Sequence, residues 1–416
     1  MQWSNKLINI RAFKAVRPDP KLVSRFVVPP YDVLNYNDCL KLSQNNPDSF
    51  IRVTRSEVEF DGIDPYSPAV YQKASDNLRT FIDKGVLIVE EKPSIYVYEQ
   101  TLDGRIQTGF VACVSIEDYG ADKIKKHEKT RKEKEIDRIK HIETTMAHTE
   151  PSFMIYRNNS NLNAILTDTV SQKPLYDFTT NDTVKHRYWI ISDKDSIAVI
   201  INEFKKINAL YIADGHHRSQ SSYLVGKQNP NNEEAQWFPA VIFPEETLSI
   251  IDYNRAVKDL NGHTSISFLE TIKQDFIVNE VKPNRKNNGF SPEKKFQIGI
   301  YIDHIWYALS PKKTPVTDDP IETLDVYLLQ SLILEPILGI TDPRTDKRID
   351  FFGGSKGTGL LKDIVDSKEF AVSFSMFPTT ITELIKVADA GLLMPPKSTW
   401  FEPKLISGLS IHLLDE

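Results

Sequence analysis

The sequence predicts an α/β (α+β) protein that folds into two or three lobes. Short β-prone apolar runs alternate with segments that carry helix start and stop signals, a pattern typical of interleaved strands and helices. The 416 residues suffice for two or three domains with a sizeable core. A hydrophobic content of 40% and a charged content of 26% are those of an ordinary globular protein.

Local signals place the first elements. We expect a helix around Asp38–Ser43 and a second that runs to Lys84, with Ser67 as N-cap, Pro68 at the first position and Gly85 as the stop. A hairpin is predicted from two β-prone runs on either side of an Asp-Gly turn. The hairpin and the later strands are expected at Ser94–Gln100, Ile106–Ile116, Phe153–Tyr156, Arg187–Ile191, Ala209–Ala213 and Phe238–Phe243.

The C-terminal part begins with a polar, turn-rich stretch, Lys282–Lys295, that we interpret as a linker or long loop. A second hairpin is predicted after it, over 297–310. A helix Ile321–Glu335 is expected, because Asp319 can cap it and Pro320 suits its first position. The expected domains are 1–90, 91–280 and 281–416.

Composition excludes several classes of protein. A formal net charge of −6 and a pI near 5.9 argue against a general binder of nucleic acid or anionic membranes. The two cysteines match no metal spacing and are too few for a disulfide scaffold. No basic-then-apolar signal segment and no uncharged run of transmembrane length are recognised, so we expect a cytoplasmic protein.

The most informative stretch is 207–223, INALYIADGHHRSQSSY. An apolar run ends at Asp214-Gly215, where glycine permits a sharp exit from a strand, and His216-His217-Arg218 follow as the first turn of a helix. The free N–H groups of a helix N-terminus attract anions, so we predict a phosphate-handling corner. Two alternatives remain: the histidines lock a turn by hydrogen bonding, or they bind a metal, for which the spacing gives no support.

The second informative segment is Lys123–His148. Thr130 and Glu133 have the spacing of a capping box, which predicts a helix that begins at Thr130. Glu128 then lies on the turn before this helix, where a carboxylate can act as a general base beside basic neighbours that hold an anion. Alternatively, the whole run is a solvated, charged helix.

A third segment, Asp342–Ile364, is rich in glycine. Its spacing fits neither a Walker loop nor a dinucleotide fingerprint. We interpret it as a glycine-rich turn leading into a helix over Leu360–Asp366, with a secondary contact to a nucleotide or substrate left open.

Together, six segments resemble the signature blocks of a widespread domain-of-unknown-function family, in order along nearly the whole chain. They are PPYDV (29–33), HEKT (127–130), ADGHHR (213–218), DYNRAVKDL (252–260), DFFGG (350–354) and MPPKSTWFEPK (394–404). The central part of that family is similar to the ParB/sulfiredoxin-like superfamily. The resemblance implies such a central domain with a mixed sheet, flanked by N- and C-terminal α/β elements.

Members that resemble this chain are associated with ATP-dependent phosphorylation of free L-serine to O-phosphoserine. The resemblance therefore implies a small-molecule kinase with ATP as co-substrate and Mg²⁺ as cofactor. The implied partners are L-serine and a nucleotide, without nucleic acid or membrane, and a homodimer is left open. ATP versus ADP as donor, and serine versus another hydroxyl substrate, also stay open.

The resemblance also assigns roles to residues. Glu128 would be the base, and His216, His217 and Arg218 would neutralise phosphate charge; Asp214 would bind magnesium or orient a histidine. Asp32 would bind the substrate amine or merely stabilise a turn. The remaining candidates are Gly215, His127, Lys129, Thr130 and Arg138 for the nucleotide phosphates and Tyr31 for the substrate.

Two other functions remain open: a ParB-like protein that binds or hydrolyses a nucleotide for regulation, and a nucleotide-sensing scaffold without turnover. The acidic balance and the lack of a basic helix-turn-helix weigh against the first. A geometric condition separates the kinase hypothesis from both. Glu128 and His216 or His217 must face one cleft.

Overall fold

A computed structural model describes residues 7–284, 288–354 and 357–415. The chain divides into two compact units. The first comprises the residues up to Leu248 together with those from Pro403 onward, and the second is Ser249–Glu402. This division differs from the three domains expected from the sequence, because the N-terminal ninety residues and the last residues of the chain both pack into the first unit.

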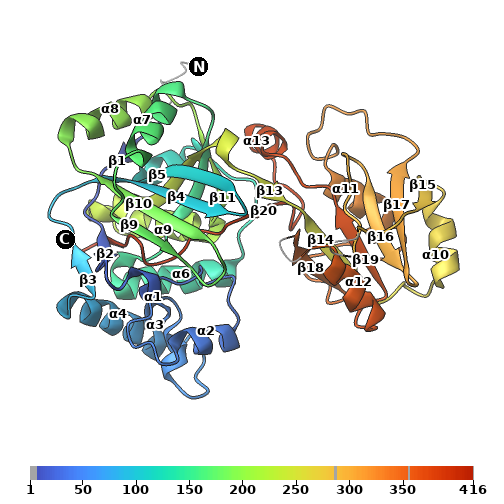
Figure 1. The fold of residues 1–416 in the computed structure, drawn as a ribbon, viewed down its shortest axis with the longest axis horizontal. Coiled ribbons are helices and arrows are strands. Elements are labelled where there is room, and N and C mark those ends of the chain that lie inside the picture. Colours follow the sequence, from blue (N-terminus) through green and yellow to red (C-terminus); the bar gives the residue numbers. More distant parts are fainter. Residues whose placement is uncertain (1–6, 285–287, 355–356, 416) are drawn as a thin grey trace. The chain divides into compact units, whose positions relative to one another are not determined.

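The first unit is built on a mixed sheet (Figure 1). Among the described residues it has nine strands in the order β6-β11-β8-β12-β5-β4-β10-β9, with β1 also paired to β5. The pairs β11–β6 and β12–β8 are parallel and the others are antiparallel. The strands are β1 (Ile10–Arg11), β4 (Ile95–Leu102), β5 (Arg105–Ser115), β6 (Ile124–Lys125), β8 (Ser152–Tyr156), β9 (Tyr176–Thr179), β10 (Lys185–Ile191), β11 (Leu210–Asp214) and β12 (Trp237–Pro244).

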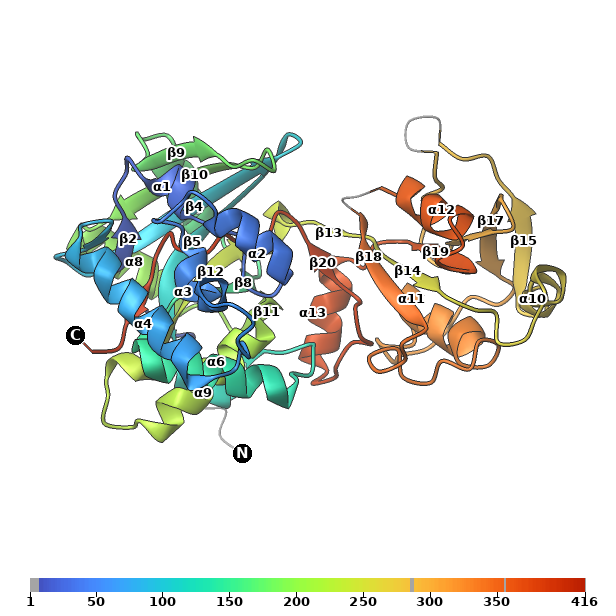
Figure 2. The ribbon, with the colours of Figure 1, turned by 90° about the horizontal axis from the view of Figure 1, so that it is seen from below.

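Helices cover this sheet, and two short strand pairs complete the unit. Helices α7 and α8 bury Leu162, Leu166, Ile200 and Phe204 in the main apolar core against the sheet (Figure 1). Figure 2 shows α4, α6 and α9 close together, and α6 contacts both others. The helices are α1 (Val23–Phe26), α2 (Tyr36–Ser43), α3 (Ile51–Thr54), α4 (Pro68–Asp83), α5 (Ile116–Gly120), α6 (Lys132–Thr145), α7 (Ser160–Val170), α8 (Lys194–Phe204) and α9 (His216–Gln228). The strand pairs are β2 (Val16–Pro18) with β3 (Leu87–Val89) and β7 (Ala147–His148) with β21 (His412–Leu413).

The second unit holds an antiparallel sheet of six strands within the described ranges, in the order β15-β17-β16-β19-β14-β18. Helix α12 packs on β16 and β19 of this sheet. The strands are β14 (Tyr253–Val257), β15 (Phe276–Glu280), β16 (Ile298–Ile302), β17 (Ile305–Pro311), β18 (Ile349–Gly353) and β19 (Val372–Met376), and β13 (Ile250–Ile251) pairs with β20 (Trp400–Phe401). The helices are α10 (Ser265–Ile272), α11 (Asp325–Leu329), a π-helical turn (Gln330–Leu334), α12 (Gly359–Asp366) and α13 (Ile381–Asp389).

The predicted α/β class with a mixed sheet is confirmed, as are the helix after Ser67 and both hairpins. In the first hairpin Asp103 and Gly104 both have positive φ, of 51° and 77°, which is the backbone of a tight turn between twisted strands. The similarity of the core to the ParB/sulfiredoxin-like superfamily stays a prediction. No helix in the described part of the chain combines the length and apolarity needed to cross a membrane.

One predicted feature of the C-terminal part is wrong, and another is confirmed. Helix α11 begins at Asp325 rather than Ile321. The Asp319 carboxylate accepts a hydrogen bond from Ile321 N at 2.8 Å, but the residues that follow form a turn and not a helix. The described residues of the stretch Lys282–Lys295, namely 282–284 and 288–295, lie between β15 and β16 and form no helix or strand, as expected for a long loop. They belong to the second unit. Ser355 and Lys356 of the glycine-rich segment lie outside the described residues, while α12 follows it as predicted.

Candidate functional site

The candidate site is built around the junction of β11 and α9. A register shift between Ile212 and Asp214 ends the regular pairing of β11 with β8. Gly215 then turns the chain with a φ of 87°, and α9 starts at His216. A Cβ on residue 215 would lie 2.8 Å from Arg218 Nε, closer than real Cβ atoms approach other atoms. Glycine is therefore needed here for the backbone angle and for the space beside Arg218.

The start of α9 presents unpaired helical N–H groups. The first hydrogen bond of the turn runs from Ser219 N to Gly215 O at 2.9 Å. The N–H groups of His216, His217 and Arg218 precede it and have no acceptor within the helix, so they form the positive end of the helix dipole. This arrangement confirms the predicted strand–turn–helix geometry. That the turn binds an anion stays a prediction.

The loop after β6 brings Glu128 to the same corner. Strand β6 runs parallel to β11, with Ile124 opposite Leu210, so the two strands leave the sheet at the same edge. The His127 N–H donates to His216 Nε2 at 3.5 Å, and the two rings meet edge to face with centroids 4.5 Å apart. Glu128 Oε2 lies 3.9 Å from His216 Nδ1. Glu128 and His216 thus lie together, although they are far apart in the sequence.

The hydrogen bonds assign the protons of the two helix histidines. His216 Nε2 accepts from His127 N–H, so the neutral ring carries its proton on Nδ1, toward Glu128. His217 Nε2 accepts from Arg131 N at 3.0 Å, so its proton is also on Nδ1. Both rings therefore have one N–H to offer to an acceptor in the site.

Burial decides the charge of the site histidines. Burial, followed by the adjacent His216, lowers the pKa of His127 to about 3. Burial lowers the pKa of His216 to about 3 as well, and it lowers the pKa of His217. The sequence suggests three potential cations in this motif, but the histidines are neutral near pH 7. Arg218 remains the cation of the motif.

Asp214 is held by two cations. Lys404 Nζ donates to Asp214 Oδ2 at 3.1 Å, and Arg218 Nη2 lies 3.8 Å from the same oxygen. Although burial raises it, Lys404 and Arg218 keep the pKa of Asp214 well below its usual value. The Gly215 N–H donates to Asp214 Oδ1 at 2.8 Å. The carboxylate is therefore ionised and fixed against the turn.

These contacts do not suit Asp214 as a magnesium ligand. Its Oδ2 faces two cations and its Oδ1 accepts a main-chain N–H, which leaves it engaged on both oxygens. In the described ranges no group of three or more His, Cys, Asp or Glu side chains is placed to hold a metal ion. The other role expected for Asp214 was to orient a histidine. Its hydrogen bonds and ion pairs go instead to Lys404, Arg218 and the Gly215 N–H.

Arg138 and Tyr31 meet in a buried network beside the corner. The Arg138 guanidinium lies 4.0 Å from the centre of the Tyr31 ring and donates to Asp137 Oδ2 at 2.9 Å. Glu150 accepts from Tyr31 N at 3.0 Å and lies 3.9 Å from Arg138 Nη1. Arg138 is only 7% exposed. Arg138 and Glu150 therefore hold the PPYDV segment in place.

Asp32, next to Tyr31, is exposed. Burial lowers the pKa of the Arg218 guanidinium, but the charges of Asp32 and Asp214 outweigh this effect and raise the pKa above its usual value. Asp32 also acts to raise the pKa of His217 against the larger effect of burial. The Asp32 carboxylate therefore lies close enough to act on both side chains at the start of α9.

Thr130 does not cap a helix as predicted. Helix α6 begins at Lys132 with Arg131 as its N-cap residue, and the Thr130 hydroxyl donates to Glu135 instead. Arg131 has an extended backbone, and its N–H donates to the His217 ring. Lys129 is exposed in the same loop.

The sequence analysis missed two residues of this corner. Lys404 comes from the C-terminal segment, and its only signal was its place in the MPPKSTWFEPK block. Glu150 precedes Pro151 at the start of β8 and accepts from Tyr31 N and from Ser407 Oγ at 2.6 Å. Neither contact has a local sequence pattern, because each joins segments that are far apart along the chain.

Known proteins were compared with the whole chain. A comparison with curated proteins gives no match. Among solved structures, a C-terminally truncated SbnI from Staphylococcus aureus has a TM-score of 0.38 and 14% identity, with 73% of this chain and 87% of that chain covered. A free serine kinase in complex with AMP has a TM-score of 0.35 and 12% identity, with 70% of this chain and 86% of that chain covered. A conserved hypothetical protein from Pyrococcus furiosus has a TM-score of 0.34 and 13% identity, with 73% of this chain and 95% of that chain covered.

A family model covers most of the chain. The model described as protein of unknown function (DUF1015) matches residues 10–327, which include β11, α9 and the loop that carries Glu128. The resemblance to a domain-of-unknown-function family is thereby confirmed, and the chain belongs to the DUF1015 family.

Proposed function

We propose that this protein transfers the γ-phosphoryl group of ATP to the hydroxyl group of free L-serine and forms O-phospho-L-serine and ADP. The observation that carries the proposal is the distance of 3.9 Å between Glu128 Oε2 and His216 Nδ1. This distance shows that a carboxylate lies beside the N-terminus of α9, which is the positive end of the helix dipole. A carboxylate for the acceptor and an anion site for the donor are the two parts that phosphoryl transfer requires.

Glu128 is the base in this proposal. Its side chain is 48% exposed, whereas the neighbouring His216 is 5% exposed, so the carboxylate is the accessible member of the pair. Glu128 takes the proton from the serine hydroxyl as the oxygen lone pair attacks the γ-phosphorus. The bond between that phosphorus and the oxygen bridging to the β-phosphate breaks, and its electron pair leaves with ADP.

The start of α9 holds the phosphates. The main-chain N–H groups of the first turn and the Arg218 guanidinium offer donors to the transferring group. The neutral imidazole of His217 adds a hydrogen bond through Nδ1–H. Asp214 and Lys404 hold Arg218 and the turn in position. Catalysis then rests on positioning and on electrostatic stabilisation rather than on a covalent intermediate.

Asp32 binds the ammonium group of serine in this account. It is exposed and acts electrostatically on His217 and Arg218, so it borders the place where the phosphoryl acceptor must lie. A carboxylate there attracts an ammonium group and so favours an amino acid over a plain alcohol.

The experiment is a substrate panel. The full chain is incubated with ATP and Mg²⁺ together with L-serine, D-serine, L-threonine, L-homoserine or ethanolamine, and ADP release and the ³¹P NMR spectrum are recorded. We expect ADP release that depends on L-serine and a new phosphomonoester resonance of O-phosphoserine. ADP formed at the same rate without any amino acid would favour the nucleotide-hydrolysing alternative, and no ADP with any acceptor would exclude the kinase.

A further inference from the structure

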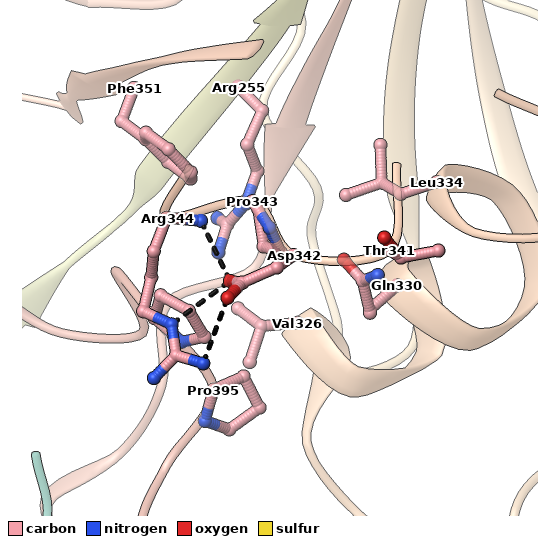
Figure 3. A pocket seen from close by; sticks show the side chains of 11 residues that line it. Arg255, Val326, Gln330, Leu334, Thr341, Asp342, Pro343, Arg344, Phe351 and Pro395 are labelled. Atoms are coloured by element: carbon pink, nitrogen blue, oxygen red, sulfur yellow. Dashed lines mark hydrogen bonds and ion pairs between the residues drawn. The ribbon is translucent and has the colours of Figure 1, made fainter. Parts of the chain in front are cut away.

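The second unit contains a cavity of about 340 Å³ that plays no part in the proposed reaction. Figure 3 shows its lining. The lining residues come from β14, α11, the π-helical turn, the segment after it, β18 and the prolines Pro395 and Pro396. The residues that matter here are Arg255, Val326, Gln330, Leu334, Arg344 and Phe351. The volume is in the range of small-molecule sites in proteins.

Arg255 is a buried cation without a carboxylate partner among the described residues. It is 3% exposed and lies on β14, which pairs with β18 on one side and with β19 on the other. Its Nη1 donates to Tyr253 O and its Nη2 donates to Lys397 O at 2.9 Å, and both acceptors are main-chain carbonyls. Burial lowers the pKa of Arg255 to about 10, so the guanidinium remains charged near pH 7.

The hydrogen bonds of Arg255 leave donors to spare. A guanidinium has five N–H donors, and the two carbonyls use two of them. A buried charge without a counter-charge is costly, and an anion that enters the cavity removes that cost. Carboxylate and phosphate groups both match the planar donor geometry of arginine.

Gln330 supplies a hydrogen-bond acceptor to the cavity, whereas Arg255 supplies donors. Its Nε2 donates to Ile340 O at 2.8 Å, which fixes the orientation of the amide. Its Oε1 is buried and has no hydrogen-bond partner among the described residues. A buried acceptor without a partner is satisfied by a ligand that carries an N–H donor.

Apolar side chains and an ion pair complete the lining. Val326, Leu334 and Phe351 add apolar surface to the lining, around the two polar groups (Figure 3). Arg344 lines the same cavity but is 53% exposed, and its guanidinium already pairs with Asp342 at 2.9 Å. Asp342 therefore neutralises Arg344, and Arg255 is the cation left for a ligand.

We propose that this cavity binds a small molecule with the chemistry of an α-amino acid that has an apolar side chain. Its carboxylate pairs with Arg255, its ammonium group donates to Gln330 Oε1, and its side chain packs against Val326, Leu334 and Phe351. All these residues belong to the second unit, and none is assigned to phosphoryl transfer. The site is thus a second ligand site, and its existence does not depend on the kinase activity.

Calorimetry on the full chain tests this site with four probes. L-leucine carries both polar groups, 4-methylpentanoate lacks the amine, isopentylamine lacks the carboxylate, and inorganic phosphate is an anion without apolar surface. We expect L-leucine to bind best, and each half-probe to bind about tenfold more weakly or worse, because a hydrogen bond to a charged group is lost. No binding of L-leucine, or tighter binding of phosphate, overturns the proposal.

Matched variants locate the binding. We expect Arg255→Met to weaken L-leucine binding about tenfold or more and Arg344→Met to change it little, because only Arg255 lacks a counter-charge. Equal effects of the two substitutions contradict the assignment. If circular dichroism shows that Arg255→Met does not fold, the calorimetry of L-leucine binding to Gln330→Met tests the proposal instead. It must reduce L-leucine binding to the level of 4-methylpentanoate, and unchanged L-leucine binding overturns the proposal.

Discussion

Gly215 shows at the scale of one residue how the backbone shapes the proposed phosphate site. The residue has a φ of 87°, and a Cβ there would lie 2.8 Å from Arg218 Nε. Gly104 in the β4–β5 turn has a φ of 77° and nothing within 4 Å of such a Cβ. Alanine should cost about 1–2 kcal/mol at either position because of the backbone angle. Gly215→Ala should cost more, because the guanidinium must also move.

Urea unfolding of the two glycine variants, followed by circular dichroism, measures this difference. Gly215→Ala is expected to lose more free energy of unfolding than Gly104→Ala and also to bind ATP more weakly. Equal losses in the two variants, with unchanged ATP binding, would show that the space beside Arg218 is not part of the site.

The residues of the site were predictable to the extent that their signals are local. Glu128 and the DGHHR turn were identified because a glycine after an apolar run and a carboxylate before a helix are short patterns. The neutrality of His216 was not predictable, because it results from burial by other segments. Lys404 was assigned no role, because its contact with Asp214 joins residues that are 190 positions apart.

Helices and strands were likewise predictable where the signal is local in the sequence, and not where distant segments determine it. Helix α4 and the β4–β5 hairpin were predicted because Ser67-Pro68, Gly85 and Asp103-Gly104 are sufficient signals by themselves. Helix α6 starts two residues after the predicted Thr130, where the Thr130 hydroxyl donates to Glu135 and the Arg131 N–H donates to the His217 ring. The spacing of Thr130 and Glu133 alone therefore does not set the start of this helix.

The division into units depends on pairings across the whole chain. After the second unit, the chain returns to the first, where β21 pairs with β7 and Ile411 pairs with Val16. The N-terminal segment joins the same unit through the pairing of β1 with β5. Such pairings leave little trace in local composition, which explains why the predicted boundaries at residues 90 and 280 differ from those observed.

Buried histidines make the stability of the whole molecule depend on pH. Burial lowers the pKa of His127 and His216 to about 3 and that of His141 and His186 to about 4. The unfolded chain, with histidine pKa values near 6.5, then binds more protons than the folded chain below that pH. The stabilisation is fully present above pH 6.5 and is lost as the pH falls from 6.5 toward 4.

Each such histidine should cost about 1 kcal/mol per pH unit in this window, as an order of magnitude. The free energy of unfolding in urea at pH 7.5, 6.5 and 5.5 measures the effect, and His186→Gln should make the decline shallower. A free energy of unfolding that stays constant or rises between pH 6.5 and 5.5 contradicts the neutral state assigned to these rings.

The most direct test of the central claim is a comparison of Glu128→Gln with Glu133→Gln. The control residue, in the first turn of α6, has a side chain that is 69% exposed. Single-turnover formation of O-phosphoserine and calorimetric ATP binding are measured for both variants and the unaltered protein. We expect Glu128→Gln to lose about 10²-fold or more in turnover with ATP binding kept, because only the base is removed, and Glu133→Gln to be unaffected. Full turnover in Glu128→Gln would contradict the account.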